Sequence, residues 1–169
     1  MVETYTKIEG FENYSVSDFG NVRNDKTSRI LKGADNGREY LHVCLVENKV
    51  RHNKVIHKLT ADAFLNNPKN RKCVDHIDNN KLNNNLINLR FATHTQNGQN
   101  RSMSSKNTSG TKGVHWNKKN NKWTAQITIN GKRINLGSFL DKDDAINIIV
   151  QRAKDEFGEY INKCELVIT

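Results

Sequence analysis

The sequence contains no acidic residue between Asn79 and Leu140, although the 169-residue chain has 18 Asp and Glu. Ten of the 27 Lys and Arg lie in this stretch, so it accounts for the formal net charge of +9. Mutual repulsion among these charges opposes compaction unless a polyanion binds them. An ordinary solvated surface usually mixes both signs of charge. Nucleic acid is therefore the expected partner.

Long apolar runs and paired cysteines are also absent. No segment approaches the roughly 20 apolar residues of a membrane helix, and the first ten residues lack the apolar part of a secretory signal. Cys44, Cys73 and Cys164 are widely spaced and form no Cys-x-x-Cys pair, which argues against a disulfide framework and a Cys-rich zinc site. We expect an intracellular, cytoplasmic protein of one or two small domains with no membrane association.

The first segment, from about Tyr5 to Lys54, has the pattern of short strands. Tyr14 to Ser17 and Asn21 to Asn24 flank the turn-type sequence Asp18-Phe19-Gly20, and Tyr40 to Val46 alternates apolar with polar residues. These features predict a small antiparallel sheet. The sheet is equally suited to cap the next segment or to contact DNA.

The second segment predicts a strand, a long loop, a strand and a helix, preceded by another helix. Apolar residues from Val55 to Leu65 have helical spacing. Cys73 to Asp78 reads as a strand, an Asn-rich loop follows, Leu86 to Ala92 reads as a second strand, and Thr93 to Arg101 can form a short helix.

The third segment follows Ser102 to Gly110, whose Ser, Asn, Lys and Gly indicate a flexible basic linker. Three strands are predicted, at Lys112 to Trp116, Lys122 to Ile129 and Lys132 to Phe139. The Asn130-Gly131 pair between the last two is a strong hairpin signal. Alternation makes one face of this sheet apolar and the other polar and basic.

A helix is predicted to cover the apolar face of the third segment. Asp141 is its expected N-cap and Gly158 its expected end. The buried stripe is expected to consist of Ile146, Ile149, Val150, Ala153 and Phe157.

One set of polar residues suggests hydrolytic chemistry. Asp75 and His76 are adjacent, and Asn88 and Asn97 follow. Asp75 and Asn97 can give oxygen ligands to a hard divalent cation, and His76 can take a proton from water near neutral pH. A metal ion and a base together can hydrolyse a phosphodiester, because the ion stabilises the developing charge and the leaving 3′-oxygen. By spacing alone this set is a weak signal, since Asn is abundant here.

The longer string is more specific. Four stretches closely resemble HNH endonucleases of the phage and intron-homing type: His57-Lys58-Leu59, Val74-Asp75-His76-Ile77-Asp78-Asn79-Asn80-Lys81-Leu82-Asn83-Asn84, Asn88-Leu89-Arg90-Phe91-Ala92-Thr93 and Gln96-Asn97. The resemblance implies a ββα-metal fold. It also implies His76 as general base, Asp75 as metal ligand, Asn88 as the brace of the loop, and Asn97 as the second metal ligand. His94 is the alternative to Asn97.

The flanking segments resemble known companions of such nucleases. Glu3 to Asn24, and especially Ile8 to Val22, is similar to the NUMOD4 module. The third segment is similar to the AP2 DNA-binding domain, which lays its sheet into the major groove. This likeness and the basic charge give a set of DNA-binding candidates: Arg90, Arg101, Lys106, Lys112, His115, Lys119, Lys122, Gln126, Thr128, Arg133 and Asn135. His115, Thr128 and Asn135 depart from the plant-type pattern, so target specificity does not carry over.

Together these features predict an α+β protein with a small N-terminal antiparallel β module (1–54), a ββα-metal HNH core (55–101), a basic linker (102–110), a three-stranded AP2-like sheet with a helix (111–160) and a tail (161–169). The expected function is site-specific DNA cleavage of the homing type with one Mg²⁺ or Mn²⁺ per site. Its partner is double-stranded DNA, bound by a monomer rather than a homodimer, and a phage or viral origin is plausible. The alternatives are a restriction-type HNH nuclease, a non-catalytic DNA-binding regulator and an RNA-binding ribosomal-type protein.

Overall fold

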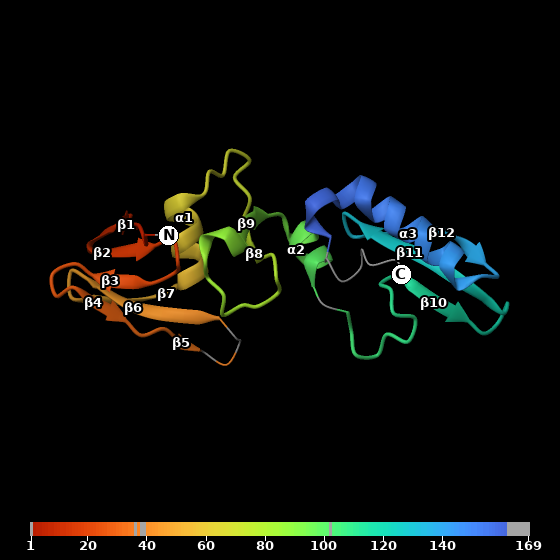
Figure 1. Cartoon of the computed structure of the whole chain (residues 1–169), viewed down its shortest axis with the longest axis horizontal. Coiled ribbons are helices and arrows are strands. Elements are labelled where there is room, and N and C mark those ends of the chain that lie inside the picture. The colour runs from red at the N-terminus through yellow and green to blue at the C-terminus, as the bar shows by residue number, and fades with distance from the viewer. Residues whose placement is uncertain (1, 36, 38–39, 102, 162–169) are drawn as a thin grey trace. The chain divides into compact units, whose positions relative to one another are not determined.

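The structure, a computed structural model, describes residues 2–35, 37, 40–101 and 103–161. The chain divides into two compact units, the first ending at Thr93 and the second beginning at His94, and each is described by itself. Small antiparallel sheets and helices make the described part α+β, as expected (Figure 1). Apart from Ile161, the expected tail lies outside the described residues, and so does Cys164.

The first unit begins with two small antiparallel sheets. One has the order β1-β2-β3-β4, formed by β1 (Tyr5–Ile8), β2 (Phe11–Ser17), β3 (Val22–Asn24) and β4 (Arg29–Leu31). The other consists of β5 (Ala34–Asp35), β6 (Leu41–Glu47) and β7 (Val50–Val55). The predicted antiparallel strands are confirmed, as is the turn at Asp18-Phe19-Gly20, where Gly20 has φ +82°.

Helix α1 (Ile56–Phe64) shares one core with these sheets. Val16, Val22 and Leu45 are completely buried, and Ile56 at the start of α1 belongs to the same cluster. Leu59, on the next turn of the helix, packs against it. Burial of apolar surface is the main stabilising term in folding, so the N-terminal sheets and α1 stabilise each other.

A two-stranded sheet of β8 (Cys73–His76) and β9 (Leu89–Ala92) completes the first unit. The strand predicted from Leu86 is wrong over its first three residues, which form the 3-10 turn η1 (Leu86–Asn88). The Asn85 side chain accepts a hydrogen bond from the Ile87 amide and caps this turn. A capping Asn offers the backbone an alternative to strand pairing.

The second unit contains α2 (His94–Asn100), the sheet β10-β11-β12 and helix α3 (Lys142–Phe157), which is followed by the 3-10 turn η2 (Gly158–Tyr160). Strand β10 spans Val114–Asn117, β11 spans Lys122–Ile129 and β12 spans Lys132–Phe139. The predicted hairpin is confirmed, with positive φ at Asn130 and Gly131. The Asp141 carboxylate accepts a 2.7 Å hydrogen bond from the Asp143 amide and caps α3 as predicted.

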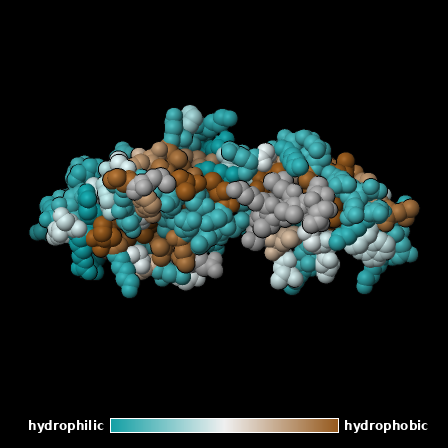
Figure 2. Space-filling model, viewed as in Figure 1, coloured by the Kyte–Doolittle hydropathy of each residue, from teal (hydrophilic) through white to brown (hydrophobic). Residues whose placement is uncertain are grey.

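Helix α3 packs across the apolar face of the three-stranded sheet (Figure 1). Ile149, Val150 and Phe157 are buried as predicted, whereas Ala145 takes the fully buried position and Ile146 is only partly buried. Hydrophilic residues cover much of the surface visible in Figure 2. No described helix is long and apolar enough to cross a membrane.

Candidate active site

Asp75 and His76 are the last two residues of β8, and both are buried, at 4% and 5% exposure. Arg90 pairs directly opposite Asp75 on β9. Its Nε lies 2.9 Å and its Nη2 lies 2.8 Å from Asp75 Oδ2. We expected Arg90 to bind DNA phosphate, but the structure engages its guanidinium with Asp75. This ion pair compensates the charge of a carboxylate that would be costly to bury alone.

The His76 imidazole is held by an amide that sequence reasoning missed. His76 Nε2 lies 3.2 Å from Asn84 Oδ1, and Asn84 Nδ2 donates a 3.4 Å hydrogen bond to the Leu82 carbonyl. Burial lowers the pKa of His76 below 6.5, and this effect outweighs the hydrogen bond that His76 donates to Asn84 and the charges of Asp78 and Asp75, which raise it. A neutral imidazole at neutral pH can accept a proton from water.

Two further rings pack around His76. The His57 ring from α1 lies edge-on to it with centroids 4.9 Å apart, and the Tyr40 ring lies 5.0 Å from His57 and 6.1 Å from His76. The Lys81 ammonium lies 5.1 Å from the Tyr40 ring centroid. Burial, with the positive potential of His76 and nearby cations, lowers the pKa of His57 to about 3. His57 belongs to the stretches that resemble HNH endonucleases, so the sequence pointed to it. No sequence feature pointed to Tyr40.

Asn88 braces the loop that follows β8. Its Oδ1 accepts a 3.0 Å hydrogen bond from the Asp78 amide, while its Nδ2 donates to Asp78 Oδ1 and to the Asn83 carbonyl, both at 2.9 Å. Its own carbonyl accepts from the Ile77 amide. A single buried side chain thus ties both ends of the Asn-rich loop together.

The second expected metal ligand, Asn97, lies half-buried on α2 in the second unit, whereas Asp75 belongs to the first. The metal role of Asn97 therefore stays a prediction, as does the alternative, the exposed His94. Among the described residues no group of three or more His, Cys, Asp or Glu could hold a metal ion. A carboxylate such as that of Asp75 suits Mg²⁺, which usually keeps several waters and phosphate oxygens as its other ligands.

The polar face of the second unit's sheet gathers four of the DNA-binding candidates into two cross-strand pairs. Gln126 lies opposite Asn135 and Thr128 lies opposite Arg133, so members of each pair share a face. His115, opposite Thr124, is exposed. Because α3 covers the opposite, apolar face, these side chains remain on the open side of the sheet.

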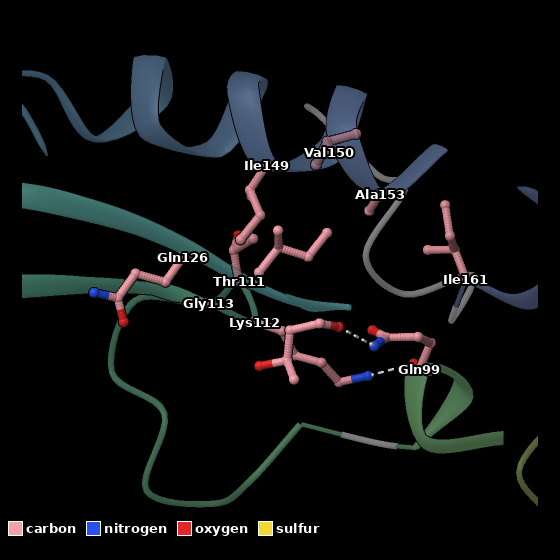
Figure 3. Close-up of a pocket in the computed structure, with 11 residues that line it drawn as sticks. Gln99, Thr111, Lys112, Gly113, Gln126, Ile149, Val150, Ala153 and Ile161 are labelled. Atoms are coloured by element: carbon pink, nitrogen blue, oxygen red, sulfur yellow. Dashed lines mark hydrogen bonds between the residues drawn. The ribbon is translucent and has the colours of Figure 1, made fainter. Parts of the chain in front are cut away.

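The remaining candidates differ in their surroundings. Lys106, Lys119 and Arg101 are exposed and lie outside strands, and Lys122 is half-buried at the start of β11. Lys112 is directed elsewhere: its ammonium donates a 2.7 Å hydrogen bond to the Gln99 carbonyl (Figure 3). An ammonium has three N–H donors, so this bond uses one of them and leaves the role of Lys112 in DNA binding a prediction.

Close to this contact lies a pocket of about 210 Å³ between α2, the sheet and α3, and Figure 3 draws the residues that line it. Gln99, Lys112, Ile149 and Ile161 contribute to its lining, which belongs entirely to the second unit. Gln99 Nε2 also donates to the Thr128 carbonyl at 3.3 Å. These contacts attach α2 to the second unit and contain none of Asp75, His76 or Asn88.

Comparison with known families now identifies the segments. Residues 3–46 match the NUMOD4 motif, and residues 67–99 match the HNH endonuclease family. The chain carries an HNH endonuclease region. Asp75, His76, Asn88 and Asn97 all fall within the matched residues of this region.

Several proteins with similar sequences come from viruses. Two uncharacterized HNH endonucleases of Acanthamoeba polyphaga mimivirus are 43% and 37% identical over 95 and 97 residues, which are 54% and 57% of this chain but 24% and 29% of theirs. Protein 3.8 of Escherichia phage T7 is 43% identical over 65 residues, 38% of this chain and 54% of that protein. The match thus spans about a quarter of the length of the first two relatives.

A solved structure of the HNH homing endonuclease I-HmuI, described for its DNA binding and cleavage, resembles most of this chain. The TM-score is 0.55 with 26% identity, and the likeness covers 92% of this chain and 83% of that one. The resemblance therefore extends beyond the HNH region into both units.

Proposed function

We propose that this protein is a site-specific, metal-dependent DNA endonuclease of the homing type. The observation that carries the proposal is the buried Asp75-His76 pair at the end of β8, inside the HNH endonuclease region. The likeness to I-HmuI over most of the chain supports DNA as the substrate. The acid-free basic stretch supplies the charge that attracts it.

The residues divide the chemistry among them. His76, neutral because it is buried, takes a proton from the water that attacks phosphorus. Asp75 and Asn97 would hold Mg²⁺ or Mn²⁺, an ion that stabilises charge on the phosphate and on the leaving 3′-oxygen. Asn88 keeps the loop after β8 in place through its bonds to Asp78 and Asn83.

Target recognition belongs to the AP2-like sheet of the second unit. Arg133 can form a bidentate contact with guanine, and Gln126 or Asn135 can pair with the edge of adenine. The exposed Arg101, Lys106 and Lys119, with Lys122, are placed to contact phosphates and set the register on the duplex. One site of this kind cuts one strand per binding event, so a monomer that nicks is favoured.

Plasmid relaxation tests the proposal. A supercoiled plasmid library carrying random target sites is incubated with the full chain and Mg²⁺ or Mn²⁺, and nicked circles are mapped. Wild type is expected to nick a defined subset, and His76→Ala is expected to bind DNA in a gel shift without nicking it. His52→Ala, which removes a half-buried His of the same unit outside the site, is the control. Absence of nicking by wild type, or equal nicking by His76→Ala, contradicts the proposal.

A further inference from the structure

The turn between β2 and β3, which lies within the NUMOD4 match, touches the loop that carries Asn84. A Cβ atom added at Gly20 would lie 2.7 Å from Asn84 Cβ and 2.8 Å from the Asn84 carbonyl oxygen. Two residues further along, the Leu86 amide donates a 2.8 Å hydrogen bond to the Asp18 carbonyl. Turn and loop are therefore in direct backbone contact, and only glycine allows this approach.

The turn itself is held by the body of the first unit. The Asp18 carboxylate accepts hydrogen bonds from the Thr4 amide at 3.0 Å and the Thr4 hydroxyl at 3.2 Å. The fully buried Ser17 hydroxyl accepts one from the Asn21 amide at 3.0 Å. A turn fixed at both ends offers a rigid surface to the loop that rests on it.

Asn84 contacts both this turn and His76, the candidate general base. It is only 5% exposed, and its amide nitrogen donates to the Leu82 carbonyl, which turns Oδ1 toward His76 Nε2. An amide oxygen only accepts, so the imidazole proton must sit on Nε2 for this bond to form. In a neutral imidazole the other nitrogen, Nδ1, then carries the basic lone pair.

We propose that the β2–β3 turn of the NUMOD4 motif is a positioning element of the nuclease. Gly20 and Asp18 seat Asn84, and Asn84 holds His76 with its proton on Nε2. Nδ1 is then the atom that receives the proton of the attacking water. The water oxygen forms the new bond to phosphorus, and the bond to the 3′-oxygen breaks with its electron pair on that oxygen. The role of Nδ1 rests on the proposed function, whereas the turn contact and the tautomer do not.

The contact between Gly20 and Asn84 allows two roles of the NUMOD4 motif to be told apart: positioning of His76 and direct binding of DNA. The backbone atoms of Gly20 face Asn84, so a methyl group there disturbs the catalytic loop from inside the unit. If the turn acted only by binding DNA, the same change would lower affinity and leave the nicking rate of bound DNA unchanged. Each alternative therefore predicts a different response of the same variant.

The test is nitrogen NMR of His76 in the full chain, combined with nicking and DNA-binding assays. Long-range proton–nitrogen spectra at pH above the His76 titration are expected to show the Nε2-protonated form in wild type. Asn84→Leu, similar in volume but without an acceptor, is expected to mix the two tautomers. It should lower the nicking rate about tenfold to a hundredfold, as loss of a supporting hydrogen bond does in comparable sites. Asn84→Asp, which keeps an acceptor, is expected to restore the Nε2-protonated form.

Gly20→Ala is expected to shift the His76 nitrogen signals and slow nicking at unchanged DNA affinity. Gly10→Ala is its matched control, because Gly10 also has positive φ, +73°, but nothing within 4 Å of an added Cβ. An Nδ1-protonated wild type, an unchanged tautomer in Asn84→Leu, or a Gly20→Ala variant that loses only affinity overturns the positioning role. Correct spectra with no nicking by wild type instead overturn the nuclease function and leave the tautomer assignment intact.

Discussion

The imidazole of His57 lies edge-on against that of His76, with ring planes at 76°. Both rings are buried, and burial is the main reason that both pKa values fall below 6.5. Two imidazolium ions in contact would repel each other without water to screen them. A neutral His57 therefore allows His76 to sit close to it, and its ring forms part of the buried surroundings that lower the pKa of His76.

This contact predicts that acid destabilises the first unit. The pKa of His57 is about 3 in the folded chain against 6.5 in the unfolded one. As pH falls from about 6.5 toward 3, the unfolded chain binds a proton that the folded chain does not. The free energy of unfolding then drops by up to about 1.4 kcal/mol per pH unit from this group. His57→Phe should reduce that slope, leaving the contribution of His76 and, at the acid end of the range, that of Asp25, whose pKa is lowered to about 2.

The measurement must report on the first unit. Both tryptophans, Trp116 and Trp123, lie in the second unit, so their fluorescence does not follow His57. Hydrogen exchange at the buried amides of Val16 and Leu45 does follow the first unit, whose core contains both residues. Equal pH slopes for wild type and His57→Phe would show that His57 is protonated in the folded chain.

The Asp75–Arg90 ion pair predicts separate effects on stability and cleavage. Arg90→Met leaves a buried carboxylate without its partner and should destabilise the first unit by about 3–5 kcal/mol. Adding Asp75→Asn removes the charge and should recover most of that loss. Nicking should be absent in the double variant and in Asp75→Asn alone, because the carboxylate proposed to bind the metal is gone. A double variant as unstable as Arg90→Met, by hydrogen exchange, contradicts the pairing.

The close surroundings of Gly113 predict that adding one methyl group there strongly destabilises the second unit. An added Cβ would lie within van der Waals radii of the Gln126 carbonyl oxygen and of Ile149 Cδ1, at a φ of +77°. Gly131 has the same φ and nothing within 4 Å, so Gly131→Ala isolates the backbone cost, about 1–2 kcal/mol. Gly113→Ala should cost clearly more. Urea unfolding followed by the Trp116–Trp123 pair measures both, and equal losses would mean that the sheet and α3 separate easily here.

Sequence patterns that involve only neighbouring residues predicted the strands and the helix cap of the second unit well. The limits of β11 and β12 were correct because alternation and the Asn130-Gly131 turn act over neighbouring residues, and Asp141 caps α3 through its own next turn. The segment predicted as a flexible linker makes specific contacts: Asn107 Nδ2 and the Ser109 hydroxyl both donate to the Thr111 carbonyl, and Ser109 is buried. Side-chain bonds of this kind give no periodicity to detect.

The candidate site was predictable only in part, for a physical reason. Asp75 and His76 were found from a string of neighbours that also contains Asn84 and Arg90, but the sequence did not show that these two, with His57 from α1, contact the pair. Strand register places Arg90 opposite Asp75, and the packing of α1 places His57 against His76. Asn84 lies against Gly20 in the β2–β3 turn, where the missing side chain leaves room for it. Contacts between distant segments depend on the packed core, which sequence periodicity does not describe.

The open face of the three-stranded sheet gives the last prediction. If Arg133 reads a base, Arg133→Ala should weaken binding to the preferred site and relax the choice of base at one position, at a cost of about 1–3 kcal/mol. Lys154→Ala is the matched control, since it removes the same charge from the exposed last turn of α3, the helix that packs on the opposite face. If Arg133 only contacts phosphate, binding should weaken equally on all sequences, and the slope of log affinity against log salt should fall by about 0.9. Titrations of target and scrambled duplexes at several salt concentrations separate these cases, and equal effects of the two variants would remove this face of the sheet from the DNA interface.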